Sequence, residues 1–326
     1  MTNILVFIIT ILVVVTLVQI IRVSELLSEL NNEDVNEVTD KDNNTQGILF
    51  LVIGFGFLVF VIWQMISWNH VILPPASSIH GTQIDLLMKV SMGLIIVVFF
   101  ITSPMLFYFA FKYRGKRSNK AYFLSHNNKL EIVWTVIPTI ILTVLIIFGL
   151  KTWDKAMNIQ ITESTKVIEV YGQQYNWTAR YSGIDNKLGK ANYKLVKGKN
   201  TLGVDMLDIN SADDKMAREV HLVVNEPVLL KFRSQDVIHS AFLPHFRVQM
   251  NCVPGITTQF GFTPNKTTAQ MKESEGEDFE YVLLCNKICG ASHFNMQMKF
   301  IVETQEEYDL WISSQETLEK KLLTQK

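Results

Sequence analysis

The chain has 326 residues, a formal charge of −1 and 48% hydrophobic residues, and the hydrophobic residues are concentrated in its first half. Acidic and basic residues nearly balance, and the one dense basic cluster flanks an apolar segment. This composition gives no support to nucleic-acid binding, which needs an extended basic surface. It indicates a membrane protein with a polar second half.

Four apolar segments come first, and each is long enough to cross a bilayer. They are Asn3–Ile21, Gly47–Ile66, Val90–Phe111 and Ile132–Leu150. At a rise of about 1.5 Å per residue, a helix of roughly 20 residues spans the hydrocarbon layer of about 30 Å. The last two segments are apolar on every face. A helix buried in the core of a soluble protein rarely stays apolar on every face over this length. We therefore expect four transmembrane helices.

A basic loop between the third and fourth segments sets the orientation. Its six positive charges, with no acidic residue before Glu131, are Lys112, Arg114, Lys116, Arg117, Lys120 and Lys129. The positive-inside rule places this loop in the cytoplasm. Everything after Trp153 and both chain termini are then extracytoplasmic, as in a multi-pass protein of a bacterial inner (plasma) membrane.

The first segment has a competing interpretation as a cleaved signal peptide. It lacks a positively charged start and a small-residue cleavage site, so we favour a membrane span. The stretch 23–46 that follows would lie inside and carries seven acids against the single Lys41. Acidic residues contribute little to topology, so four spans remain the prediction.

The second half reads as a β-rich domain. Short apolar runs bounded by turn residues predict strands, namely 167–171, 228–232, 257–262, 279–284 and 298–302. No comparable helical period occurs between them, and the next one starts at Glu306. This pattern is typical of an antiparallel sandwich or barrel.

A cluster of soft donors marks a candidate metal site in this domain. Cys285, Cys289, His293 and Met296 follow one another at intervals of four, four and three residues, and His239 lies 46 residues before Cys285. Thiolate, imidazole and thioether together suit copper electron transfer, and two cysteines suggest two copper ions with bridging sulfurs. A disulfide between the cysteines and a tetrahedral zinc site are the alternatives.

From about Ile84 to Trp311, the chain resembles subunit II of haem–copper cytochrome c oxidases, which carries the dinuclear copper centre CuA. The resemblance rests on four motifs in the family's order and spacing. They are Leu130-Glu131-Ile132-Val133-Trp134-Thr135-Val136-Ile137-Pro138, Asp236-Val237-Ile238-His239-Ser240, Val253-Pro254-Gly255 and the cysteine, cysteine, histidine, methionine cluster.

The resemblance implies a membrane-anchored α + β protein, with the helices followed by an extracytoplasmic cupredoxin-like Greek-key β-barrel. It also implies a set of copper ligands. These are the side chains of His239, Cys285, Cys289, His293 and Met296 and the backbone carbonyl of Lys287.

Lys287 departs from the family, which usually has a glutamate that reaches a magnesium ion shared with subunit I. A carbonyl ligand tolerates any side chain, so copper binding should survive. A lysine ammonium has no acceptor and cannot bind magnesium, which argues against the shared magnesium site.

Three further residues receive roles from the resemblance. Tyr175, where the family commonly has tryptophan, and Trp177 match the surface at which electrons enter, although both rings could simply pack in a strand. Glu131 matches a residue by the mouth of a proton path into subunit I. A helix-start carboxylate, favoured by the helix dipole, is the alternative.

The function implied is electron input to a terminal respiratory oxidase. A cytochrome c, or a cytochrome c domain of a donor complex, would supply electrons, and haem in subunit I, which also holds CuB, would receive them for reduction of oxygen to water coupled to proton translocation. Other oxidase subunits and membrane lipid are the further partners. Three alternative functions remain. They are subunit II of a quinol oxidase, which lacks the copper ligands, a copper-delivery or sensing protein, and a structural membrane scaffold.

This interpretation divides the chain into five parts. They are 1–46, an extra N-terminal transmembrane helix and acidic loop; 47–81, a second extra helix and outer loop; 82–153, the transmembrane hairpin of the oxidase subunit II type; 154–305, the CuA domain; and 306–326, a C-terminal helix or tail.

Overall fold

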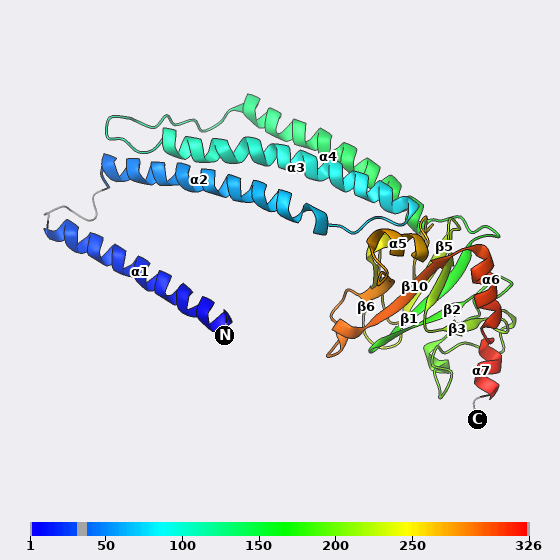
Figure 1. The fold of residues 1–326 in the computed structure, drawn as a ribbon. Helices are drawn as coiled ribbons and strands as arrows, with labels where there is room; N and C mark the ends of the chain where they lie inside the picture. Colours follow the sequence, from blue (N-terminus) through cyan, green and yellow to red (C-terminus); the bar gives the residue numbers. More distant parts are fainter. Residues whose placement is uncertain (1, 31–37, 325–326) are drawn as a thin grey trace. The chain divides into compact units, whose positions relative to one another are not determined.

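The computed structural model describes residues 2–30 and 38–324. In these ranges four long helices precede a β-rich domain (Figure 1). The helices are α1 Thr2–Leu30, α2 Asp40–Trp68, α3 Ile79–Lys112 and α4 Asn128–Met157. All four are long and apolar enough to cross a membrane. Part of the expected acidic loop, residues 31–37, lies outside the described residues.

The chain divides into two compact units. One contains α1, α2 and the part of α3 from Ile95 on, together with the loop that follows it to Asn127. The other contains residues 70–94 and everything from Asn128 on, so it combines the start of α3, α4 and the β-rich domain.

In the first unit, α2 packs closely on the second part of α3. Gly54 is buried, and a Cβ atom there would collide with the ring of Phe107. At the start of α2, the Asp40 carboxylate accepts the backbone N–H of Arg117 at 2.9 Å. The acidic beginning of α2 thus contacts the basic loop after α3.

Within the described residues, the β-rich domain contains ten strands in two five-stranded sheets. The first sheet has the order β3-β2-β1-β5-β8 and the second β4-β10-β9-β6-β7. The strands are β1 Lys166–Gln173, β2 Asn176–Tyr181, β3 Lys215–Ala217, β4 Val220–Val223, β5 Val228–Ser234, β6 His239–Leu243, β7 Val248–Cys252, β8 Thr258–Phe262, β9 Tyr281–Cys285 and β10 Gln297–Glu303. The pairs β1–β5 and β4–β10 are parallel, and the other neighbours are antiparallel.

The two sheets bury a common core. Leu230 and Phe232 from the first sheet and Leu283 and Phe300 from the second are fully buried in one cluster. In β10 buried positions alternate with more exposed ones, because successive side chains of a strand point to opposite faces. This core holds the strands that carry the metal-ligand candidates.

Short helices complete the domain. They are α5 Thr268–Glu275, α6 Gln305–Ser314, α7 Leu318–Thr324 and the 3₁₀ segments Tyr193–Leu195, Ile209–Ser211, Pro244–Phe246 and His293–Asn295; a further 3₁₀ segment, Asn69–Val71, directly follows α2. The expectation of no helix before Glu306 was wrong for α5. Thr267 and Gln270 form a reciprocal capping box that starts this helix.

The long connection between β2 and β3 folds over the first sheet. Its residues Leu202 and Val204 form a small buried cluster with Tyr171 of β1 and Leu318 of α7. Since this cluster covers the face of β1 that points away from the main core, six consecutive residues of the strand are buried.

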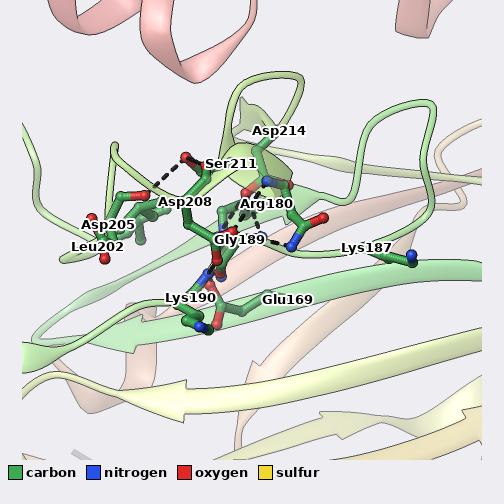
Figure 2. A network of polar contacts seen from close by, with 12 residues as sticks. Glu169, Arg180, Lys187, Gly189, Lys190, Leu202, Asp205, Asp208, Ser211 and Asp214 are labelled. Carbon is green, nitrogen blue, oxygen red and sulfur yellow. Dashed lines mark hydrogen bonds and ion pairs between the residues drawn. The ribbon is translucent and has the colours of Figure 1, made fainter.

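A buried ionic network fastens this connection (Figure 2). The guanidinium of Arg180 donates to Glu169, to Asp214 and to the carbonyl of Gly189, each at 2.8 Å. Arg233 donates to the same Glu169. The side chains of Arg180, Glu169 and Asp214 are at most 4% exposed, so each charge depends on its partners for stabilisation.

Arg247 joins the β-rich domain to the start of α3. It adopts a left-handed conformation with φ of 55°, and its guanidinium binds Asp85 at 2.8 Å and the carbonyl of Pro74 at 2.6 Å. Nearby, the backbone N–H of Ser77 donates to the carbonyl of His245 at 2.7 Å. The segment before α3 is therefore attached directly to the connection between β6 and β7.

Candidate metal centre

The candidate ligands come from the ends of three neighbouring strands. His239 begins β6, Cys285 ends β9, and Met296 directly precedes β10. Because β6 pairs with β9, with Ala241 opposite Cys285, the distant His239 lies beside the first cysteine. Residues 285–296, here called the ligand loop, connect β9 to β10.

The two cysteine sulfurs form the middle of the cluster. The Sγ atoms of Cys285 and Cys289 are 3.8 Å apart, far longer than a disulfide bond of about 2.05 Å. The thiols of these two residues and of Cys252 are all free. The structure therefore does not support the disulfide alternative.

The other donors surround this pair. Nδ1 of His239 lies 3.8 Å and the carbonyl oxygen of Lys287 3.3 Å from Sγ of Cys285. Nδ1 of His293 lies 3.6 Å and Sδ of Met296 3.8 Å from Sγ of Cys289. Ligand atoms of His239 and the two cysteines all lie within 4.8 Å of one another. Five side-chain donors and a carbonyl exceed the four ligands of a structural zinc site.

Burial keeps the Cys289 thiol protonated when no metal ion is bound. His239, Cys289 and Met296 are buried. Burial, with Cys285 as a neighbour, raises the pKa of the Cys289 thiol to about 11. A metal ion must therefore displace a firmly held proton to gain this thiolate as a ligand.

Asp236 orients the first histidine. Its Oδ1 lies 2.8 Å from Nε2 of His239, and its Oδ2 accepts the backbone N–H of Gln174 at 2.7 Å. Burial opposes ionisation of Asp236, but the hydrogen bonds from Gln174, His239 and Val237 outweigh it and lower the pKa. A carboxylate on Nε2 leaves Nδ1 unprotonated and facing the sulfurs, as in many metal sites.

The two aromatic candidates lie next to this cluster. Trp177 is buried, and its ring meets that of His239 edge to face at 5.7 Å between centroids. Tyr175 is half-buried, and its hydroxyl accepts the backbone N–H of Ala291 in the ligand loop at 3.0 Å. Both residues also pack against the core, as the alternative interpretation required.

Glu131 does not lie on the strands that carry the ligand candidates. It lies in the first turn of α4. This is the helix-start position of the alternative interpretation, and its role at a proton path stays a prediction. The side chain of Lys287 is exposed.

Sequence reasoning missed two residues at the site, Asp236 and Gln174. Asp236 stands three residues before a candidate ligand, which could have suggested a carboxylate partner for the imidazole. Gln174 carries no comparable signal, because its contacts reach 62 and 115 residues along the chain.

A membrane-anchored β-sandwich that gathers two thiols, two imidazoles and a thioether at the ends of three strands defines a copper-binding protein of the electron-transfer type. Family models agree: that of the cytochrome c oxidase subunit II transmembrane domain matches residues 63–152, and that of the periplasmic domain matches residues 166–304. The chain belongs to the cytochrome c oxidase subunit II family.

Individual relatives are moderately similar. The alternative cytochrome c oxidase subunit 2 of Bradyrhizobium diazoefficiens is 28% identical, over 83% of this chain and 91% of the relative. The cytochrome c oxidase subunit 2 of Cereibacter sphaeroides is 26% identical, over 73% and 78%. The crystal structure of the periplasmic domain of subunit II of a Bradyrhizobium japonicum cytochrome oxidase covers 48% of this chain and 94% of that domain, at 25% identity and a TM-score of 0.32.

Proposed function

We propose that this chain is the electron-input subunit of a terminal respiratory oxidase and that it holds a dinuclear CuA centre. The ligands are the side chains of His239, Cys285, Cys289, His293 and Met296 and the carbonyl of Lys287. The observation that carries the proposal is the pair of sulfurs 3.8 Å apart, each approached by an imidazole Nδ1 and a second weaker donor. Two thiolates at this spacing can bridge two metal ions.

The chain's own residues prepare the centre for rapid electron exchange. When bound, copper supplies a one-electron redox couple. His239 and Cys289 are buried, which keeps water from the ligand atoms. Strands β9 and β10 fix the two ends of the ligand loop and β6 holds His239, so little ligand movement accompanies a change of charge.

Electrons arrive from a cytochrome c or a cytochrome c domain of a donor complex, through Tyr175 and Trp177. The edge contact of Trp177 with His239 makes this route short. The electrons then pass to haem in subunit I. There oxygen is reduced to water at haem and CuB, with proton translocation. Glu131 stands at the mouth of the proton path.

We infer that no magnesium ion is shared with subunit I at this loop. The carbonyl of Lys287 faces Cys285, while the exposed ammonium has no lone pair to offer a divalent cation. The positive charge of Lys287 takes the place of that ion.

The β-rich domain is a Greek-key cupredoxin in this proposal, and it lies outside a bacterial inner membrane. All four apolar helices cross the bilayer in contact with lipid, and both termini are extracytoplasmic. The region before residue 63 precedes the matched family models, and we propose that α1 and most of α2 pack against another oxidase subunit or a donor complex.

The full chain, purified in detergent and loaded with copper, tests this function. Two coppers per chain and an electron paramagnetic resonance spectrum of one electron shared between them are expected. Cys289→Ala should abolish that spectrum. Cys252→Ala is the matched control, because Cys252 is buried outside the ligand set, and should leave the spectrum intact. One localised copper per wild-type chain would contradict the proposal.

A further inference from the structure

The turn between β1 and β2 lies against the ligand loop. Gln174 and Tyr175 form this turn, since Gln173 pairs with Asn176 at the end of the ladder. The side-chain Nε2 of Gln174 donates to the carbonyl of Cys289 at 2.5 Å. Tyr175 accepts the N–H of Ala291 two residues further on. Two consecutive residues thus hold two backbone groups of the loop.

Gln174 also reaches the other side of the centre. Its backbone N–H donates to Oδ2 of Asp236 at 2.7 Å, and Oδ1 of the same carboxylate lies 2.8 Å from Nε2 of His239. Gln174 is therefore hydrogen-bonded through its side chain to the peptide of the candidate ligand Cys289. Through its backbone N–H it is hydrogen-bonded to Asp236, which supports the candidate ligand His239. His239 and Cys289 lie 50 residues apart in sequence and on different elements.

The fit between turn and loop is close. Gly290, directly after Cys289, has φ of 137°, and a Cβ atom there would lie 2.9 Å from Nε2 of Gln174 and would collide with the hydroxyl of Tyr175. A side chain at position 290 would push the turn away. The sequence thus provides a donor in Gln174, an acceptor in Tyr175 and, in Gly290, the space that both need.

We propose that Gln174 is a positioning residue for the copper centre. Its side-chain amide fixes the Cys289 peptide, and its backbone N–H fixes the Asp236–His239 pair, so that both imidazole and thiolate keep their places when copper changes charge. This inference rests on the proposed copper function. The residue does not touch the metal; it acts through Cys289 and Asp236.

Gln174→Glu is the direct test, because glutamate has nearly the same shape but presents a carboxylate oxygen, not an N–H, to the Cys289 carbonyl. Gln174→Met keeps the length without any donor. Gln173→Glu and Gln173→Met are the matched controls on the neighbouring residue of the same hairpin. The full chain is loaded with copper, and three quantities are measured: the resonance spectrum, the reduction potential and copper retention against a chelator.

The Gln174 variants should lose about 10- to 100-fold in copper affinity, the usual loss for a partner that supports a metal ligand, with a changed hyperfine pattern and a shifted potential. The Gln173 variants should match the wild type. Gln174 variants with wild-type spectrum, potential and affinity would overturn the inference. So would Gln174 variants that fail to fold without copper, since the residue would then support the fold and not the ligands. A wild-type chain without the shared-electron spectrum would instead remove the proposed function itself.

Discussion

Replacing Arg180 by methionine should destabilise the β-rich domain strongly. The guanidinium makes three hydrogen bonds of 2.8 Å to Glu169, Asp214 and Gly189. Glu169 would keep Arg233 as a partner, but Asp214 would keep only the N–H of Gly189. Removing one partner of a buried ion pair costs about 3–5 kcal/mol, because the remaining charge is left buried and uncompensated.

The assay is thermal unfolding of the full chain in detergent, followed by near-ultraviolet circular dichroism. At about 2–4 °C per kcal/mol for a domain of roughly this size, the midpoint should fall by about 6–20 °C. Arg218→Met is the control, because Arg218 is exposed. Arg180→Met with Asp214→Asn should recover part of the loss. Equal midpoints for Arg180→Met and Arg218→Met would refute the reasoning.

Burial raises the pKa of Asp214 from 3.8 to about 6. Between pH 3.8 and pH 6, the folded state therefore holds a proton that the unfolded chain has released. The contribution of Asp214 to stability is lost as the pH rises through this window. The melting temperature of the wild type minus that of Asp214→Asn should therefore fall between about pH 4 and pH 7; a rise would contradict the sign. Gly290→Ala should cost about 1–3 kcal/mol of stability from backbone strain and broaden the copper spectrum, whereas Gly276→Ala, also at positive φ but facing open space, should change stability alone. Lys287→Glu should raise the magnesium content of the assembled oxidase, and an unchanged content would show that something other than the missing carboxylate excludes the ion.

The uninterrupted apolar segments predicted the long helices well, because a helix that crosses a bilayer needs continuous apolar length. The helices nevertheless extend past the apolar segments. For example, α4 starts at Asn128 and ends at Met157, four and seven residues beyond the segment recognised by hydropathy. The polar ends carry no apolar signal, although their backbone continues the same hydrogen-bond pattern.

The sandwich was only half visible in the sequence. Strands such as β1 and β10 contain clear apolar runs and were predicted, whereas β6 and β7 were not. His239 and Ser240 at the start of β6 are polar yet fully or almost fully buried, since the neighbouring strands β7 and β9 take up their backbone groups. Local pattern cannot show such burial, because it arises from pairing between distant segments.

The ligand candidates were predictable for the opposite reason. Soft donors at short intervals carry a chemical meaning that does not depend on knowing the fold. The structure brings His239 and Met296 to the sulfurs as expected. The supporting contacts of Gln174 were beyond prediction, because glutamine suits almost any polar position and only the folded hairpin gives it a specific partner.

The attachment made by Arg247 bears on the speed of the electron's onward step. Asp85, at the start of α3, and the carbonyl of Pro74 both bind its guanidinium, so the start of this helix is held to the connection that follows β6, the strand of His239. Tunnelling between redox centres weakens exponentially with separation, and even a small swing of a hinged domain would spread the rate over a wide range. The Arg247 contacts oppose such a swing at the junction between the start of α3 and the β-rich domain. They therefore narrow the range of separations between the candidate metal centre and any acceptor held in the membrane.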